Sequence, residues 1–300
     1  MGYVILNNGV KMPKIGYGVY QISREDCKRC VLDAIKVGYR LIDTAQSYFN
    51  EEEVGDAIQE AIKQGLVKRE ELFITSKVWI DNYGYEKCKN SVLDSMKKLK
   101  VDYLDLMLLH QPFSDYYGAY RALEELYQEG KIRAIGVSNF YPDRLADICL
   151  FERKVIPQIN QVETNVFNAQ FEAQQNMEKY NVQIEAWAPF AEGRNNMFSN
   201  EVLVKIGEKY NKSVAQVILR WLTQRNVVAL SKSTSMERMK ENFNIFDFEL
   251  SAEDMDKIKE LDTKTSLFFS HYDPNMVAWF DQTVISRRTN QDHLKDKKNW

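Results

Sequence analysis

The feature that most constrains the fold is a regular alternation of short apolar segments with longer amphipathic ones. Eight apolar runs, each followed by a polar loop, have the length and composition of buried parallel strands. They are KIGYGV (14–19), YRLID (39–43), LFITSK (72–77), YLDLMLLH (103–110), IRAIGVS (132–138), IPQINQV (156–162), VQIEAW (182–187) and VVALSK (227–232). Eight strand–helix units favour a closed (β/α)8 TIM barrel over a doubly wound sheet.

Helical spacing in the intervening segments agrees with this interpretation. Apolar side chains recur at i, i+3, i+4, i+7 and i+8 on one face of the segment that begins at Val214. Gly130 is expected to end the helix before IRAIGVS. A Rossmann fold would require a Gly-x-Gly-x-x-Gly turn after the first strand, and the nearest candidate, GYGVYQ (16–21), lacks the third glycine. A nicotinamide cofactor, if bound, is therefore not expected to be held in the Rossmann manner.

The two ends of the chain depart from the repeat. YVIL and VKMP flank Asn7-Asn8-Gly9, a strong hairpin signal. Ser251 is expected to cap an additional helix over 250–262. Residues 263–300 show no clear periodicity, and their aromatic-rich part, TSLFFSHYDPNMVAWF (265–280), suggests a loop over the barrel mouth. We expect one domain over residues 1–300, with a mobile tail over 286–300.

Composition narrows the possible partners and the compartment. The net charge of −3 favours neither nucleic acid nor an anionic membrane as a partner. No secretory signal is expected at the N-terminus, and no run of about 18 apolar residues predicts a membrane span. Cys27 and Cys30 form a C-x-x-C inside a helical pattern that begins after Ser23, so we interpret them as reduced helix thiols. Few cysteines in a long chain fit a reducing cytoplasm.

Four polar residues at or just after strand ends suggest chemistry on a carbonyl group. Asp43, Lys77 and His110 each close an apolar run, and Tyr48 follows Asp43 by five residues. In a parallel barrel, the carboxyl ends of the strands form the catalytic face. The Lys77 ammonium would favour ionisation of the Tyr48 phenol, Asp43 would hold the ammonium, and His110 could orient a carbonyl oxygen that Tyr48 protonates. No side chain can donate a hydride, so a nicotinamide cofactor must supply it.

Long motifs make the chain resemble the aldo-keto reductase family from the opening hairpin to about residue 280. These are GYRLIDTAQSYFNEEEVG (38–55), LFITSKVW (72–79), DYLDLMLLHQP (102–112), GKIRAIGVSNF (130–140) and SKSTSMERMKENFNIFDFEL (231–250). The resemblance implies a catalytic tetrad of Tyr48 as general acid, Lys77 and Asp43 as the residues that tune its pKa, and His110 as the residue that orients the carbonyl.

The resemblance also implies a set of contacts to NADPH/NADP+, with NADPH favoured over NADH. Ser138, Asn139 and Gln161 match contacts to the nicotinamide carboxamide, and Trp187 matches an aromatic ring that stacks on the nicotinamide. Lys232, Ser233, Thr234 and Arg238 match the segment that binds the adenosine 2′-phosphate, and Glu241 and Asn242 match positions that face the adenine. A lysine, hydroxyls and an arginine near a helix start suit a dianionic group.

Several positions differ from common family patterns. Ser231 replaces a frequent proline, Ala188-Pro189-Phe190-Ala191 replaces Ser-Pro-Leu-Gly, and Thr164-Asn165 replaces His-Pro. Gln111 follows the catalytic histidine where many animal members have tryptophan. In this respect the chain resembles bacterial members such as diketogluconate and methylglyoxal reductases.

Residues that follow the first, third and fourth strands predict a largely aromatic pocket for small carbonyls. Tyr20, Trp79 and Gln111 are expected to line it. Phe113, Tyr116 and Tyr117 follow in a nearby loop, and the lid would contain Phe268, Phe269, His271 and Tyr272. Such a pocket tolerates many small substrates without close discrimination.

The favoured function is an NADPH-dependent oxidoreductase that reduces aldehydes and ketones to alcohols. One alternative is a non-catalytic or cofactor-sensing binding protein on the same scaffold, since fold alone does not imply activity. Another is a barrel enzyme with phosphate-ester chemistry, for which no cluster with metal-ligand spacing is present in the sequence. We expect no metal site, a small-molecule carbonyl as the substrate, and a monomer in the cytoplasm.

Overall fold

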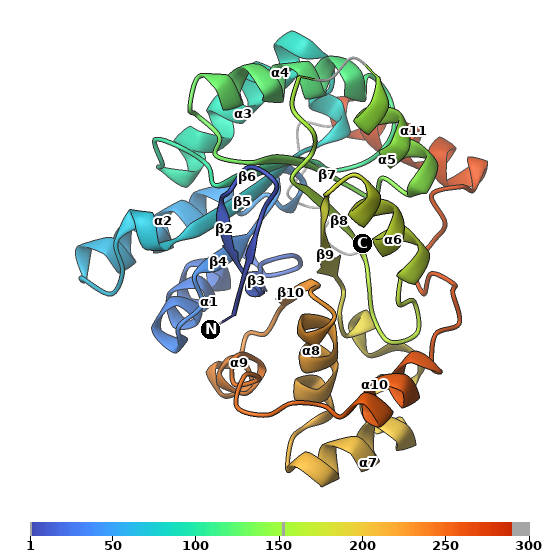
Figure 1. Ribbon diagram of the computed structural model, residues 1–300. Helices are drawn as coiled ribbons and strands as arrows, with labels where there is room; N and C mark the ends of the chain where they lie inside the picture. Colours follow the sequence, from blue (N-terminus) through green and yellow to red (C-terminus); the bar gives the residue numbers. More distant parts are fainter. Residues whose placement is uncertain (1, 152–153, 290–300) are drawn as a thin grey trace.

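The computed structural model describes residues 2–151 and 154–289, and its centre is a closed barrel of parallel strands (Figure 1). The barrel order is β10-β3-β4-β5-β6-β7-β8-β9. The strands are β3 (Ile15–Gly18), β4 (Leu41–Asp43), β5 (Phe73–Val78), β6 (Leu106–Leu109), β7 (Ile135–Ser138), β8 (Ile159–Glu163), β9 (Gln183–Trp187) and β10 (Val228–Ser231). All eight expected strands are present, so the prediction of a TIM barrel is confirmed.

The expected hairpin pairs β1 (Tyr3–Ile5) with β2 (Lys11–Pro13) and turns at Gly9, whose φ of 84° favours glycine. Val4, Leu6 and Met12 of the hairpin are buried in one cluster with the first residues of several barrel strands, including Leu41 and Phe73. The hairpin therefore closes the amino-terminal end of the barrel. This leaves the carboxyl ends of the strands as the open face.

Helices surround the barrel and occupy the segments between its strands. They are α1 (Arg24–Val37), α2 (Glu51–Lys63), α3 (Tyr85–Leu99), α4 (Tyr116–Gln128), α5 (Pro142–Leu150), α6 (Phe171–Lys179), α7 (Glu201–Tyr210), α8 (Val214–Gln224), α9 (Met236–Phe243) and α10 (Ala252–Lys259). Short 3₁₀ segments are η1 (Gln46–Tyr48), η2 (Arg69–Glu71), η3 (Ile80–Asn82) and η4 (Ala191–Ser199). Among the described residues, no helix is long and apolar enough to cross a membrane.

Local signals explain several helix ends. The Ser23 side chain accepts a hydrogen bond from Asp26 N at the start of α1, and Ser251 does the same for Asp254 N at the start of α10. Gly130 follows α4 with a φ of 72°, as expected for a residue that ends a helix. Cys27 and Cys30 are buried free thiols of α1. Burial raises the pKa of Cys27 to about 12, which makes this thiol unreactive near neutrality.

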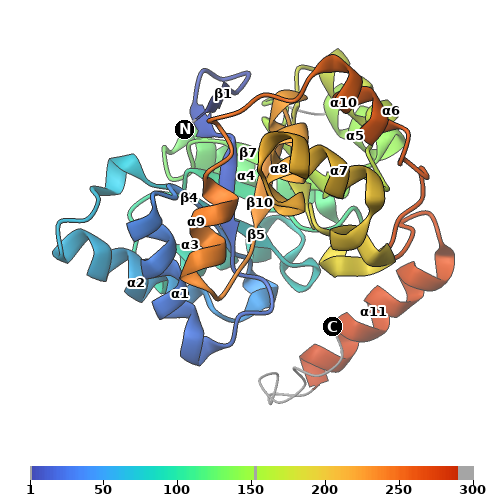
Figure 2. The same ribbon diagram turned by 90° about the horizontal axis from the view of Figure 1, so that it is seen from below.

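The C-terminal region differs from the expected irregular loop because residues 274–289 form the helix α11 (Pro274–Thr289). Figure 2 shows α11 set apart from the other helices. Asp273 caps its start by accepting from Asn275 N, and Phe280 and Val284 are buried one turn apart. The tail expected from residue 286 overlaps this helix as far as Thr289. Residues 290–300 lie outside the described residues, and there the tail stays a prediction.

Candidate active site

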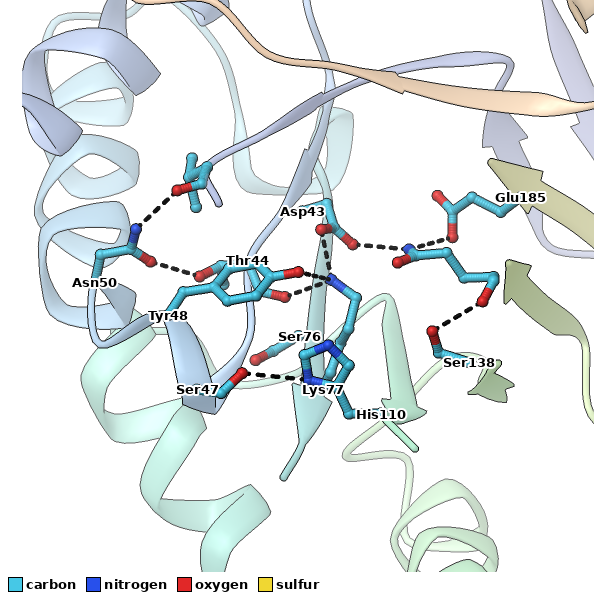
Figure 3. A network of polar contacts seen from close by, with 12 residues as sticks. Asp43, Thr44, Ser47, Tyr48, Asn50, Ser76, Lys77, His110, Ser138 and Glu185 are labelled. Atoms are coloured by element: carbon cyan, nitrogen blue, oxygen red, sulfur yellow. Dashed lines mark hydrogen bonds and ion pairs between the residues drawn. The ribbon is translucent and has the colours of Figure 1, made fainter. Parts of the chain in front are cut away.

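A buried ion pair lies at the carboxyl ends of the neighbouring strands β4 and β5 (Figure 3). Lys77 Nζ donates to Asp43 Oδ1 at 2.6 Å and to Thr44 O at 3.1 Å. The side chains of Lys77 and Asp43 are 0% and 4% exposed. Burial alone would lower the pKa of Lys77, but the Asp43 carboxylate, together with the Tyr48 oxygen, outweighs it and raises this pKa above its usual value. Lys77 is therefore a fixed cation of the site.

Tyr48 presents its hydroxyl to this cation. The η1 segment after β4 orients the half-buried ring so that Lys77 Nζ lies 3.3 Å from Tyr48 Oη (Figure 3). Burial raises the pKa of Tyr48 to about 12, and the opposing effect of Lys77 does not cancel it. The expected lowering by the ammonium is thus present but smaller than the effect of desolvation. Near neutrality Tyr48 is a protonated phenol that can donate.

His110 directly follows β6 and completes the group. Its Nδ1 lies 3.4 Å from Ser47 Oγ, and its ring lies edge-on to the rings of Tyr48 and Trp79 at centroid distances of 5.8 and 5.1 Å. Tyr20 also packs on Tyr48, with ring centroids 5.0 Å apart. The structure thus brings the four residues of the expected tetrad to one end of the barrel, beside two of the three expected pocket residues.

The residues expected to contact the nicotinamide lie next to this group. Trp187 Nε1 donates to Asn139 Oδ1 at 2.9 Å, and Asn139 Nδ2 donates to the His110 carbonyl oxygen at 3.0 Å. Ser138 Oγ donates to the Gln161 carbonyl oxygen at 2.8 Å. Gln161 Nε2 donates to Asp43 Oδ2 at 3.1 Å, which places this amide beside the buried ion pair of the site.

The residues expected to hold the 2′-phosphate lie in the loop after β10 and in the first turn of α9. Lys232, Thr234 and Arg238 are exposed around the start of α9, so both cations can reach an anion there. Ser233 is buried, and its hydroxyl accepts from Ser235 N at 3.1 Å. The Ser233 hydroxyl can therefore bind the expected phosphate only in competition with its hydrogen bond to Ser235 N. Of the two residues expected to face the adenine, Asn242 is buried and Glu241 is partly exposed.

The C-terminal segment supplies one wall of the mouth. His271 Nε2 lies 2.8 Å from Gln111 Oε1, and the imidazole is surrounded by the rings of Phe113, Phe269 and Phe280. Burial lowers the pKa of His271 to about 4, so the ring is neutral near neutrality. Phe269 and His271, two residues of the expected lid, pack against each other and against Phe280, while their role as a lid stays a prediction.

Other aromatic residues predicted near the mouth have different positions. The hydroxyls of Tyr116 and Tyr117 both bond to Asp147 of α5, so these two rings pack between helices. The Tyr272 side chain is 63% exposed. Phe268 contacts Trp187, with ring centroids 5.2 Å apart.

Three polar residues of the site were missed in the sequence. Ser47 faces His110, and Glu163 anchors the C-terminal segment by accepting from Ser266 Oγ at 2.5 Å and Leu267 N at 3.1 Å. Glu185 is fully buried beside Gln161 in the barrel interior. Its place in VQIEAW, two residues before Trp187, is an inward strand position and was a usable signal. Across the part of the chain that the structure describes, no group of three or more His, Cys, Asp or Glu side chains could hold a metal ion.

Similarity to known proteins agrees with this geometry. The chain is 49% identical to glyoxal reductase of Bacillus subtilis (strain 168) over 260 residues, which cover 86% of this chain and 92% of the relative. It is 38% identical to methylglyoxal reductase DkgA of Escherichia coli (strain K12) over 260 residues, with coverages of 86% and 92%.

Solved structures show the same architecture. An aldo-keto reductase from a Medee basin deep-sea metagenome library superposes with a TM-score of 0.86 at 40% identity, covering 90% of this chain and 98% of that one. An aldo-keto reductase of Bombyx mori in complex with NADP gives a TM-score of 0.85 at 32% identity, with coverages of 89% and 95%. The sequence profile of the Aldo/keto reductase family matches residues 8–263. The chain therefore belongs to the aldo/keto reductase family.

Proposed function

We propose that this NADPH-dependent carbonyl reductase uses Tyr48 as its general acid and acts on small aldehydes and α-oxoaldehydes. The observation that carries the proposal is the continuous contact from Asp43 through Lys77 to the Tyr48 hydroxyl at the barrel mouth. A phenol is a weak acid near neutrality, so it needs a nearby cation to stabilise the phenolate that remains after proton donation. Lys77 is that cation, and Asp43 keeps it charged and in place.

His110 and Tyr48 together define where the carbonyl oxygen binds. Their rings meet at the mouth, and the imidazole can donate a hydrogen bond to an oxygen that gains negative charge while the phenol gives it a proton. The reduced nicotinamide supplies the hydride to the carbonyl carbon. We propose that Trp187, Asn139, Ser138 and Gln161 would orient it, and their contacts beside the tetrad support this role.

The preference for NADPH has support at the far end of the site. Lys232 and Arg238 are exposed cations at the start of α9, where the helix dipole also favours an anion. A 2′-phosphate would be paired there, whereas a 2′-hydroxyl would gain little from two cations. The NADP bound to the Bombyx mori relative agrees with this proposal.

The substrate class rests on the shape and chemistry of the mouth. The rings of Trp79 and Phe113 both contact Phe280, with centroids 6.1 and 5.4 Å apart, and Gln111 is held nearby by His271. A space lined by aromatic rings with few polar groups suits small carbonyl compounds. Glyoxal and methylglyoxal, named in the two curated relatives, are small dicarbonyls that such a space can accept. Sugar-like diketones belong to the same chemical class.

The remaining properties are also proposals. We infer a single domain over residues 1–300 that acts as a monomer, with no nucleic acid or membrane partner. A cytoplasmic location is supported by four buried cysteines that remain free thiols. A dimer measured by light scattering would contradict the inference that the protein acts as a monomer.

The decisive experiment is a comparison of the wild type with Tyr48→Phe. Loss of NADPH absorbance would be followed with aldehydes, glyoxal, methylglyoxal and diketones, beside an arm with NADH. We expect kcat to fall about 10²–10⁴-fold in the variant, which is the usual contribution of general acid catalysis. Quenching of tryptophan fluorescence by NADPH should persist. Unchanged turnover would overturn the role of Tyr48, and cofactor binding without turnover by the wild type on any substrate would favour a cofactor-sensing protein.

A further inference from the structure

Glu185 is a buried acid that the reaction described above does not use. It lies in β9 directly opposite Gln161 of β8, and its side chain points toward the interior network of Asp43 and Lys77 (Figure 3). Its exposed fraction is 0%. On its other side, the register partner in β10 is Val228, which brings no charge. A carboxyl group so far from water has to be neutral or paired.

The contacts of Glu185 show that it has no cation of its own. Gln161 Nε2 donates to Glu185 Oε2 at 2.9 Å and to Asp43 Oδ2 at 3.1 Å, so one amide joins two carboxyl groups. Glu185 Oε1 has no hydrogen-bond partner among the described residues. Lys77 from β5 is bonded to Asp43, not to Glu185. Asp43 and Lys77 are the charged groups whose fields reach Glu185.

The balance of charges then favours a proton on Glu185. One ammonium can neutralise one carboxylate, and Asp43 holds it at 2.6 Å. A second carboxylate beside the first would be repelled by it and would lack compensation in a medium of low polarity. Burial, followed by the repulsion from Asp43, raises the pKa of Glu185 to about 8, while Gln161 and Lys77 oppose the shift.

We propose that Glu185 is a positioning residue that retains a proton in the working enzyme and, when it loses this proton, weakens the Tyr48 acid through Lys77. The proposal rests on the proposed function, because its effect on rate requires Tyr48 to donate the proton. An ionised Glu185 would add a negative charge near Lys77 and partly offset the positive potential of this lysine at Tyr48. A phenolate at Tyr48 would then be less stable. Proton donation then becomes less favourable, so reduction slows on the alkaline side.

The first test uses the cofactor-free protein and needs no activity. At pH 7 ordinary carboxyl groups are ionised, since their pKa values lie near 4. Infrared spectroscopy of the wild type should therefore show a carboxylic-acid carbonyl band at pH 7 that is absent from Glu185→Gln and disappears as the pH rises through about 8. Glu163→Gln is the matched control, because Glu163 is a buried acid of the next strand whose oxygens accept bonds from Ser266 and Leu267.

A second variant, at Asp43, should make Glu185 lose its proton without changing Glu185 itself. In Asp43→Asn, Lys77 loses its carboxylate, and Glu185 should ionise to replace it. The band should then be missing at pH 7 although Glu185 is still present. A band that is the same in the wild type, Glu185→Gln and Glu163→Gln would overturn the proposal, as would a band that persists in Asp43→Asn.

The third measurement connects the proton to catalysis. The profile of kcat against pH in the reductive direction should fall for the wild type above about pH 8, roughly tenfold for each unit of pH if the ionised form is inactive. Glu185→Gln should keep its rate through this range. If the infrared test shows the proton on Glu185 but the wild type and Glu185→Gln have the same profile of kcat against pH, the catalytic part of the proposal is wrong. If the wild type turns over no substrate at all, that result counts against the proposed function alone.

Discussion

The imidazole Nε2 of His271 lies 2.8 Å from the amide oxygen of Gln111, although 160 positions separate them in the chain. Gln111 is the residue after the catalytic candidate His110, and His271 lies beyond residue 263, where the match to the family profile ends. A segment outside the family match thus fixes the orientation of a side chain at the centre of the site. The histidine Nε2 and Asn139 Nδ2 both face Gln111 Oε1, at 2.8 and 3.4 Å, so contacts from two elements hold this amide.

Replacing His271 should affect substrate binding more than the chemical step. His271→Phe keeps an aromatic ring among Phe113, Phe269 and Phe280 but removes the hydrogen bond that holds Gln111. Loss of one such bond costs about 1–2 kcal/mol, so we expect KM for methylglyoxal to rise about 5- to 30-fold with kcat nearly unchanged. Steady-state kinetics would measure this. Tyr272→Phe, at an exposed neighbour, should behave as the wild type, and an equal effect in both variants would refute the assignment.

Acid should release the C-terminal segment. The pKa of His271 is about 4 in the folded protein, below its ordinary value of 6.5, so the released state binds more protons between these two values. The contribution of the neutral ring is therefore complete above pH 6.5 and is lost as the pH falls toward 4, at most about 3 kcal/mol. Hydrogen exchange of residues 264–289 should accelerate over this range. In His271→Phe, the exchange rate of this segment should vary with pH only as the intrinsic chemical exchange rate does. If the additional acceleration persists in this variant, another titrating group causes it.

The buried pair of Asp43 and Lys77 should show strong energetic coupling. Lys77→Met leaves a carboxylate without its cation inside the barrel, and Asp43→Asn leaves the buried ammonium without its bonded carboxylate, with only Glu185, which is not bonded to it, to balance the charge. Each change should lower the free energy of unfolding by about 3–5 kcal/mol, whereas the double variant should lose much less than the sum. Urea denaturation of the wild type, the two single variants and the double variant would give the free energies of unfolding for this double-mutant cycle. The exposed i,i+4 pair of Lys98 and Asp94 is the matched control, and its coupling should not exceed about 0.5 kcal/mol.

Cofactor selectivity should depend on Arg238. Arg238→Ala removes a guanidinium that can bind the 2′-phosphate, and a charge-assisted bond of this kind contributes about 1.5–3 kcal/mol. We therefore expect KM for NADPH to rise about 10- to 100-fold while KM for NADH stays constant. Lys240→Ala, another exposed cation of α9, controls for general electrostatics. Equal losses with both cofactors would argue that Arg238 supports the helix and not the phosphate.

Much of the fold could be derived from local pattern. The eight apolar runs, the Asn-Gly hairpin and the caps at Ser23 and Ser251 act over a few residues, so the sequence alone predicts them well. The helix α11 was missed although Asp273-Pro274 is a start signal and Met276, Phe280 and Val284 recur every four residues. The many aromatic residues of the segment mask that spacing in the sequence.

The sequence by itself determined which residues reach the barrel mouth, because parallel strands bring Asp43, Lys77 and the residue after β6 to the same end whatever packs around them. Only the tertiary structure decided the state of those residues. Burial of Tyr48 exceeds the effect of Lys77 on its pKa, and Gln161 joins Glu185 to Asp43 across the barrel interior. These are properties of desolvation and of distances between strands far apart in the chain, and a linear pattern carries neither.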